Sequence, residues 1–143
     1  SNKPELLVVT GMSGAGRSTT GNALEDQGWH VIDNLPPQLL FPISDLFSKS
    51  SESLIKVAVV MDVRGGQFFA DLEQNIQKLR SHQISVRVLF LEANDAALVR
   101  RFESVRRPHP LQGEGTVLDG IAAERTQLLS LRETADIVFD TSE

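Results

Sequence analysis

The chain has 143 residues, of which 41% are hydrophobic and 23% are charged, and its net charge is −5. This composition is typical of one globular domain, and the negative charge excludes a broad electrostatic attraction to nucleic acid by this chain alone. The absence of cysteine excludes disulfides and thiolate metal sites, and no apolar run approaches the ~20 residues of a membrane-spanning helix. With no signal peptide visible, we expect a cytoplasmic protein without a membrane segment.

The first half of the chain alternates apolar runs with segments of helical spacing. Residues 6–10 (LLVVT) predict a buried strand, and residues 18–27 predict a short helix that Gly28 ends. A second strand is predicted over 29–33 and a second helix over 38–48, with the turn NLPP between them. That turn is either a simple chain reversal or a loop at the rim of a ligand site.

The second half continues the alternation. The predicted elements are a strand over 56–62, a helix from 69 to about 82, a strand over 86–92, a helix capped by Asn94 that runs to about 105, a helix over 117–135 and a strand over 136–140. Continuously apolar strands that alternate with helices are typical of a parallel sheet covered on both faces. We therefore predict an α/β fold with a five-stranded, mainly parallel sheet and helices on both faces.

Residues 11–18 (GMSGAGRS), directly after the first predicted strand, have the spacing of a phosphate-binding P-loop, G-x-x-x-x-G-K-[ST]. Glycines let successive backbone N–H groups point inward as an anion-binding nest, and the helix that follows adds the positive end of its dipole. The Ser18 hydroxyl is expected to complete a Mg²⁺ shell. The residues expected to bind a nucleotide here are Gly11, Met12, Ser13, Gly14, Ala15, Gly16, Arg17, Ser18 and Thr19. The alternative is a glycine-rich turn that merely closes a strand–helix unit.

Arginine occupies the position where the P-loop pattern has lysine. Arg17 is longer and planar, and it binds phosphate through a fork rather than as a compact point charge. Binding tolerates this change better than hydrolysis does, because hydrolysis depends on charge placed where it develops in the transition state. We therefore predict a catalytic, charge-stabilising role for Arg17 in a domain whose turnover is slow.

Two aspartates end predicted strands and are candidates for holding the metal. Asp33 ends WHVID and Asp62 ends VAVVMD, the pattern of apolar residues followed by Asp that a Walker B strand needs. Either carboxylate is predicted to hold Mg²⁺ opposite Ser18, and the alternative for each is to cap the next turn. Because ligands of such sheets bind beyond the carboxyl ends of the strands, the P-loop, Asp33, Asp62 and Glu92 are expected along one rim.

Four arginines lie within eight positions, and two of them are candidates for a lid. Arg106 and Arg107 come where a predicted helix breaks into a Pro/Gly loop, which is how a lid presents arginines to phosphates as part of the catalytic site. For Arg100 and Arg101 we favour a solvated helix face. His109, between two prolines, is a candidate base, for which an exposed loop position is the favoured alternative.

Seven segments along the chain are distinctive when taken together: GMSGAGRST, VIDNLPP, DVRGG, FLEAND, RRFESVRRPHPL, ERTQLLSLRETAD and FDTS. Together they resemble the N-terminal domain of the RapZ/YvcJ family of P-loop nucleotide-binding proteins, over nearly the whole chain. The resemblance implies a kinase-like P-loop NTPase fold that binds ATP or GTP and hydrolyses it weakly. It further implies that Asp62, Val63, Arg64 and Gly65 form a second nucleotide-contact segment, linked to GTP.

The resemblance also bears on domain organisation. The family carries a further C-terminal domain, and this chain does not begin with Met and ends at Glu143, directly after its last predicted strand. We therefore expect residues 1–143 to be the N-terminal domain of a longer protein. Protein and small-RNA partners are implied through the other domain, and a homo-oligomer of the full-length protein is an open alternative.

Three functions are compatible with these residues. The favoured one is a regulatory domain that binds ATP or GTP with Mg²⁺ and has weak ATPase or GTPase activity. The second is a small-molecule kinase with Arg106 and Arg107 as an arginine lid and Asp33 as the base near the acceptor hydroxyl. The third is a non-catalytic nucleotide-sensing module that docks protein or RNA partners, for which Arg17 is the best support in the sequence.

Overall fold

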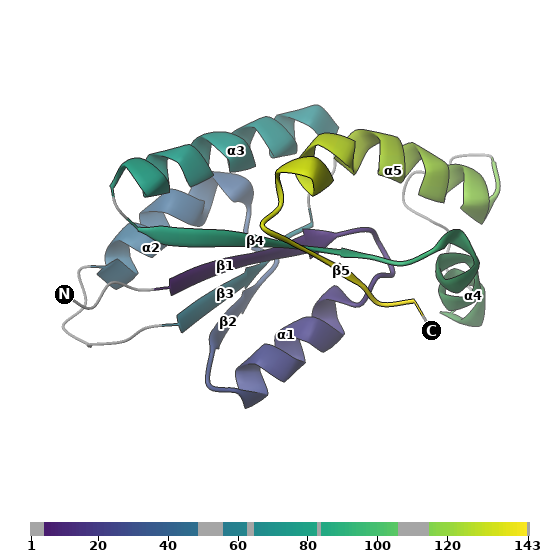
Figure 1. The fold of residues 1–143 in the computed structure, drawn as a ribbon, viewed down its shortest axis with the longest axis horizontal. Helices are drawn as coiled ribbons and strands as arrows, with labels where there is room; N and C mark the ends of the chain where they lie inside the picture. Colours follow the sequence, from purple (N-terminus) through teal and green to yellow (C-terminus); the bar gives the residue numbers. More distant parts are fainter. Residues whose placement is uncertain (1–4, 49–55, 63–64, 83, 106–114, 143) are drawn as a thin grey trace.

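The computed structural model describes residues 5–48, 56–62, 65–82, 84–105 and 115–142. Five strands form one parallel sheet in the order β2-β3-β1-β4-β5 (Figure 1). Their bounds are β1 Glu5–Gly11, β2 His30–Asp33, β3 Lys56–Val60, β4 Ser85–Glu92 and β5 Ile137–Asp140. The predicted five-stranded parallel sheet is thereby confirmed.

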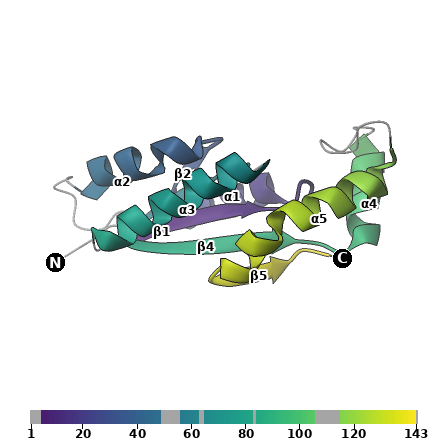
Figure 2. The same ribbon diagram turned by 90° about the horizontal axis from the view of Figure 1, so that it is seen from above.

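Helices cover both faces of this sheet, as predicted. They are α1 Arg17–Asp26, α2 Leu40–Ser48, α3 Gly65–Ser81, α4 Asp95–Val105 and α5 Val117–Thr134, with a 3₁₀ turn, η1, at Pro37–Leu39. One face carries α1, which contacts β1, β2 and β3, and the opposite face carries α2, α3 and α5 (Figures 1 and 2). Among these described helices, none combines the length and the apolar character needed to cross a bilayer.

The core lies around the central strand β1. Leu6 to Gly11 are all buried, because β1 has a neighbouring strand on each side and helices above and below. Val8 pairs with Val59 on β3 and with Val88 on β4, so three β-branched side chains lie level across the sheet. This burial on both faces explains why the run is apolar without alternation.

The predicted bounds agree with the observed ones to within a few residues, apart from two differences. Helix α3 begins at Gly65, four residues before the predicted start, because glycines at its first turn contribute no apolar periodicity. The single helix predicted over 38–48 is divided into η1 and α2, and Leu39 N–H closes the 3₁₀ turn on the Pro36 carbonyl at 3.0 Å. The predicted helix-ending glycine and helix-capping asparagine are both confirmed. Gly28 has φ +94°, and the Asn94 side chain accepts from Ala97 N–H at 2.8 Å.

Candidate functional site

The glycine-rich loop between β1 and α1 has the backbone that its sequence predicts. Gly11, Gly14 and Gly16 have φ values of +140°, +85° and +98°, which L side chains rarely adopt. At Gly11 a Cβ atom would lie 2.1 Å from the Leu91 carbonyl oxygen of β4, so only glycine fits. At Gly16 nothing lies within 4 Å of a built Cβ, so there glycine is required by backbone conformation alone.

The loop leads into the first turn of α1, where several backbone N–H groups lie close together. Ala15 N–H donates to the Met12 carbonyl at 3.1 Å, which tightens the loop and leads directly into the helix. Arg17, Ser18 and Thr19 form the first turn of α1, where backbone N–H groups have no carbonyl partner within the helix. Ser18 and Thr19 are also exposed. The arrangement therefore fits an anionic ligand such as a phosphate.

A buried carboxylate from α5 supports the loop from within the domain. Glu124 is 2% exposed and accepts from Ser13 twice, from its N–H at 2.8 Å and from its hydroxyl at 2.7 Å. Helix α5 turns Glu124 inward because it lies between the buried Ile121 and Leu128, at helical spacings of three and four residues. This role of Glu124 was not predicted from the sequence, although an acidic residue at a core-facing position of a helix is the signal for it.

Arg101 holds the loop from a second side, and the solvated position predicted for it is wrong. Its guanidinium donates to the Gly14 carbonyl at 2.9 Å and to the Thr141 hydroxyl at 3.1 Å. Thr141, just after β5, in turn donates to the Ala15 carbonyl at 2.8 Å. Helix α4 packs against the loop, with the Phe102 ring 3.2 Å from the position of a Cβ on Gly14, and that packing brings Arg101 into reach. Arg100, the residue before Arg101 on the helix, is exposed.

Arg17 and Asp62, two predicted site residues far apart in sequence, meet at the carboxyl end of β3. The Arg17 Nη1 atom lies 3.1 Å from Asp62 Oδ1 and donates to the Met61 carbonyl at 3.2 Å. Both side chains remain partly accessible, at 18% and 28% exposure. The cation of the P-loop and the candidate metal-binding carboxylate therefore lie side by side at the mouth of the loop.

Asp33 occupies a different place on the same rim. It ends β2, which lies beyond β3 as seen from β1, and it is exposed. The residues that follow it, Asn34 to Pro37, line a hollow of about 310 Å³ together with Asp62 and Phe68. Asn34 has φ +60° and donates its N–H to the Val60 carbonyl at 2.9 Å, which fixes the turn against β3.

Glu92, the fourth predicted rim residue, is held by arginines of α5. It accepts two hydrogen bonds from the Arg132 guanidinium, at 3.0 and 2.9 Å, and lies 3.7 Å from the Arg125 guanidinium. The Glu92 carboxylate, through its hydrogen bond and its charge, raises the pKa of Arg132 above its usual value. Glu92 therefore joins α5 to the end of β4.

Several predicted site residues lie outside the described residues: Val63, Arg64, Arg106, Arg107 and His109. Gly65 begins α3. Within the part of the chain that the structure describes, no group of three or more His, Asp or Glu side chains is placed to hold a metal. Mg²⁺ does not need such a cage, because it is usually held by one or two carboxylates plus water and substrate phosphates. The hydroxyl of Ser18 and the carboxylate of Asp62 are hard oxygen donors of that kind.

Known proteins similar to this chain fall into two groups. A nucleotide-binding protein of Clavibacter michiganensis and one of Leifsonia xyli are each 62% identical over 139 residues, which is 97% of this chain and 47% of each relative. The chain thus spans about half the length of these curated relatives. Among solved structures, a shikimate kinase of Acinetobacter baumannii matches with a TM-score of 0.62 and 15% identity, over 99% of this chain and 86% of that one.

A gluconokinase of Sinorhizobium meliloti matches in the same way, with a TM-score of 0.52 and 18% identity over 100% of this chain and 86% of that one. At such low identity these two kinases show the fold alone, which is that of the P-loop kinases.

The family described as "RapZ-like N-terminal domain" matches residues 4–143. That match covers nearly the whole chain and agrees with the two relatives at 62% identity. This chain therefore belongs to the RapZ-like N-terminal domain family.

Proposed function

We propose that this domain binds the triphosphate of ATP or GTP in the loop of residues 11–19. The observation that carries the proposal is the left-handed glycine backbone that opens α1, with Arg17 at its mouth. Exposed N–H groups at a helix start, a helix dipole and a nearby guanidinium all favour a phosphate anion. The Clavibacter and Leifsonia relatives are each named as nucleotide-binding proteins, which supports the same ligand class.

We assign the Mg²⁺ of the bound nucleotide to Ser18 and Asp62. The contact between Arg17 and Asp62 at 3.1 Å supports Asp62 over Asp33, because it places that carboxylate beside the P-loop. Asp33 remains the alternative ligand from the strand next to β3. When bound, the ion neutralises charge on the β- and γ-phosphates. Arg17 then exchanges part of its contact with Asp62 for the phosphate oxygens.

We further propose that hydrolysis is slow and that the domain is the nucleotide-dependent regulatory part of a longer protein. Arg17 supplies charge to the transferring phosphoryl group, but its fork differs from the compact lysine charge of the usual motif. The predicted lid arginines, Arg106 and Arg107, and the segment Val63 to Gly65 remain proposed partners of the nucleotide. Protein or small-RNA partners, a homo-oligomer and a cytoplasmic location stay predictions about the whole protein.

The experiment that tests this function is phosphate release from ATP and GTP with Mg²⁺, for the native chain, Arg17→Lys and Arg17→Ala. We expect detectable turnover by the native chain and a loss of about tenfold or more in Arg17→Ala, since one charged contact to a phosphate is worth more than ~1.4 kcal/mol. Turnover by Arg17→Lys alone would contradict slow hydrolysis by the native domain. Nucleotide binding without turnover would instead support the non-catalytic docking module.

A second candidate, phosphoryl transfer to a small molecule, is favoured by one observation. The hollow of about 310 Å³ beside Asp62 is lined by Asn34 to Pro37 and Phe68, next to the proposed phosphate site. Such a space fits a small acceptor, and Asp33, the residue before Asn34, remains the candidate for its base. Incubation with ATP labelled at the γ-phosphate and a metabolite extract distinguishes the two functions. Label recovered only as free phosphate supports hydrolysis, whereas label on a metabolite supports a kinase.

A further inference from the structure

A groove runs along one face of the sheet, from the P-loop down the side of α1. It has a volume of about 710 Å³, and apolar side chains form much of its wall. Helix α1 contributes Ala23 and Leu24, β4 contributes Leu89 and Leu91, and β5 contributes Phe139. Thr141, which follows β5, lines the end of the groove at the P-loop.

Strand β5 is unlike the other apolar strands of the sheet, because all four of its residues are exposed. Ile137, Val138 and Phe139 keep 42%, 40% and 56% of their surface accessible, whereas the corresponding part of β1 is buried. The register pairs Ile137 with Leu89 and Phe139 with Leu91, which places these four side chains on one face. Exposed apolar patches of this kind mark surfaces that bind another chain segment.

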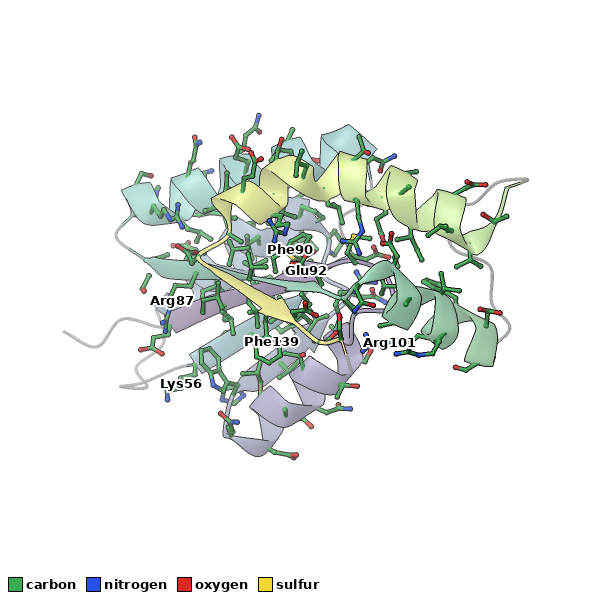
Figure 3. The ribbon with its side chains drawn as sticks, turned by 45° about the vertical axis from the view of Figure 1, so that its right-hand side comes forward. Lys56, Arg87, Phe90, Glu92, Arg101 and Phe139 are labelled. Atoms are coloured by element: carbon green, nitrogen blue, oxygen red, sulfur yellow. The ribbon has the colours of Figure 1, made fainter. Side chains whose placement is uncertain are left out.

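Over β4 and β5, that face has no covering helix in the described part of the chain. Helix α1 contacts β1, β2 and β3 on it, and α2, α3 and α5 lie on the opposite face (Figures 1 and 2). Figure 3 shows Phe139 on the side of β5 that faces α1, together with Arg101 at the end of the strand. Parallel sheets in α/β proteins are covered by helices on both faces, so β4 and β5 need one more element here.

We propose that this groove binds a helix from the polypeptide that follows this domain in the longer protein. The matched family is an N-terminal domain by its description, and the relatives are about twice as long as this chain, so they have polypeptide to supply it. Because Thr141 lies in the groove wall, such polypeptide emerges at the groove itself.

Two features favour a helix as the occupant. Each earlier strand of this sheet is followed by a helix, and a helix after β5 continues that alternation. Ser142 N–H donates to the Asp140 carboxylate at 2.7 Å, a local turn of the type that aspartate forms where a chain changes direction. The helix must present an apolar face to Leu89, Leu91 and Phe139. This inference goes beyond nucleotide binding and does not depend on it.

The absence of cysteine in this chain allows a direct test by single-cysteine labelling. Phe139→Cys reports on the groove, and Leu129→Cys, at a side chain that is 51% exposed on α5, is the matched control. Each variant is made in the 143-residue chain and in that chain extended by the polypeptide that follows it in its gene. Maleimide labelling of each site is followed by peptide mass spectrometry.

We expect both sites to label at similar rates in the 143-residue chain, and Phe139→Cys alone to slow by about tenfold or more in the extended protein. Equal labelling of Phe139→Cys in the two forms would overturn the proposal. Protection already present in the shorter chain and lost on dilution would also overturn it, because a second copy would then be the occupant. If the cysteine variants do not fold, amide hydrogen exchange of native residues 137–140 and 19–27 replaces labelling, with the same slowing expected.

Discussion

The P-loop and strand β5 both line one groove, and they differ in how far contacts within this domain cover and bond their residues. The loop is held from two sides by polar contacts, from Glu124 to Ser13 and from Arg101 and Thr141 to the carbonyls of Gly14 and Ala15. Strand β5 is paired with β4 but keeps its apolar side chains exposed. The domain therefore supplies by itself the polar contacts that hold the proposed phosphate site, whereas the apolar side chains of β5 remain exposed.

The P-loop and strand β5 differ in composition for this reason: the loop has polar contacts, whereas β5 carries exposed apolar side chains. Buried backbone and hydroxyl groups of the loop need partners, because an unsatisfied buried donor costs about 1–3 kcal/mol. An exposed apolar residue costs little in the domain alone, since it merely fails to contribute its burial. Mutations in the loop should thus reduce the stability of this domain, whereas mutations on β5 should act in the extended protein.

The largest effect is expected from Gly11→Ala. The new Cβ would lie 2.1 Å from the Leu91 carbonyl oxygen and would force β1 away from β4 in the middle of the sheet. We expect a loss of about 3–4 kcal/mol in the free energy of unfolding, measured by urea denaturation. Gly16→Ala is the control, because it has open space at its Cβ and only the strain of its φ, about 1–2 kcal/mol. Equal losses in the two variants would contradict the assigned packing of Gly11.

The next effect is expected from Glu124→Ala, which leaves the N–H and hydroxyl of Ser13 without their carboxylate. Hydrogen bonds to a charged, buried group predict a loss of roughly 2–3 kcal/mol in unfolding free energy, with weaker nucleotide binding. Glu124→Gln should lose less, because its amide oxygen still accepts one bond. Glu133→Ala, on an exposed position of the same helix, should change stability little. Similar losses in Glu133→Ala and Glu124→Ala would count against this support of the loop.

A smaller effect on stability, but a clear one on binding, is expected from Arg101→Ala. The side chain holds two elements together, the loop at Gly14 and the end of β5 at Thr141. We expect a loss of about 1 kcal/mol in stability and a several-fold weaker nucleotide affinity, measured by calorimetry. Arg101→Lys should not restore both contacts, because an ammonium lacks the guanidinium fork. Arg87→Ala, an exposed arginine on β4, is the control, and an equal effect there would refute a role in the loop.

Much of this architecture was predictable because its signals are local. The five strands are continuous apolar runs, and the loop is marked by glycines whose φ values confirm the pattern. Arg17 and Asp62 were each candidates from their own motifs, but their contact depends on β3 lying next to β1, which local patterns do not give.

The supports of the loop were not predictable for the same reason. Glu124 is 111 residues from Ser13, and Arg101 is 87 residues from Gly14, so neither contact leaves a trace in the spacing of nearby residues. In the sequence, Arg101 resembles the other arginines of its helix. Only the packing of α4 against the loop distinguishes Arg101 from them. The exposure of β5 was likewise hidden, because its apolar run looks like that of a buried strand.

The smallest effect is expected from pH at the end of β5. Hydrogen bonds from Ser142 hold the pKa of Asp140 below its usual range. The stabilising contribution of Asp140 is therefore fully present above the ordinary pKa of an unfolded aspartate, and it is lost as pH falls through the lowered pKa of the folded state. Urea unfolding at neutral and at strongly acidic pH should show a small difference between the native chain and Asp140→Asn only at neutral pH. A difference that persists in strong acid would contradict this assignment.

The measurement that tests the central claim most directly is a calorimetric titration of the chain with ATP and with GTP, each with and without Mg²⁺. Our account predicts saturable binding of at least one of them, with a dissociation constant below about 1 mM, and weaker binding without Mg²⁺ or in Ser18→Ala. Gly16→Ala should weaken the same binding, because the loop must hold its left-handed backbone to present its N–H groups. A flat titration with both nucleotides in the folded native chain would contradict the account.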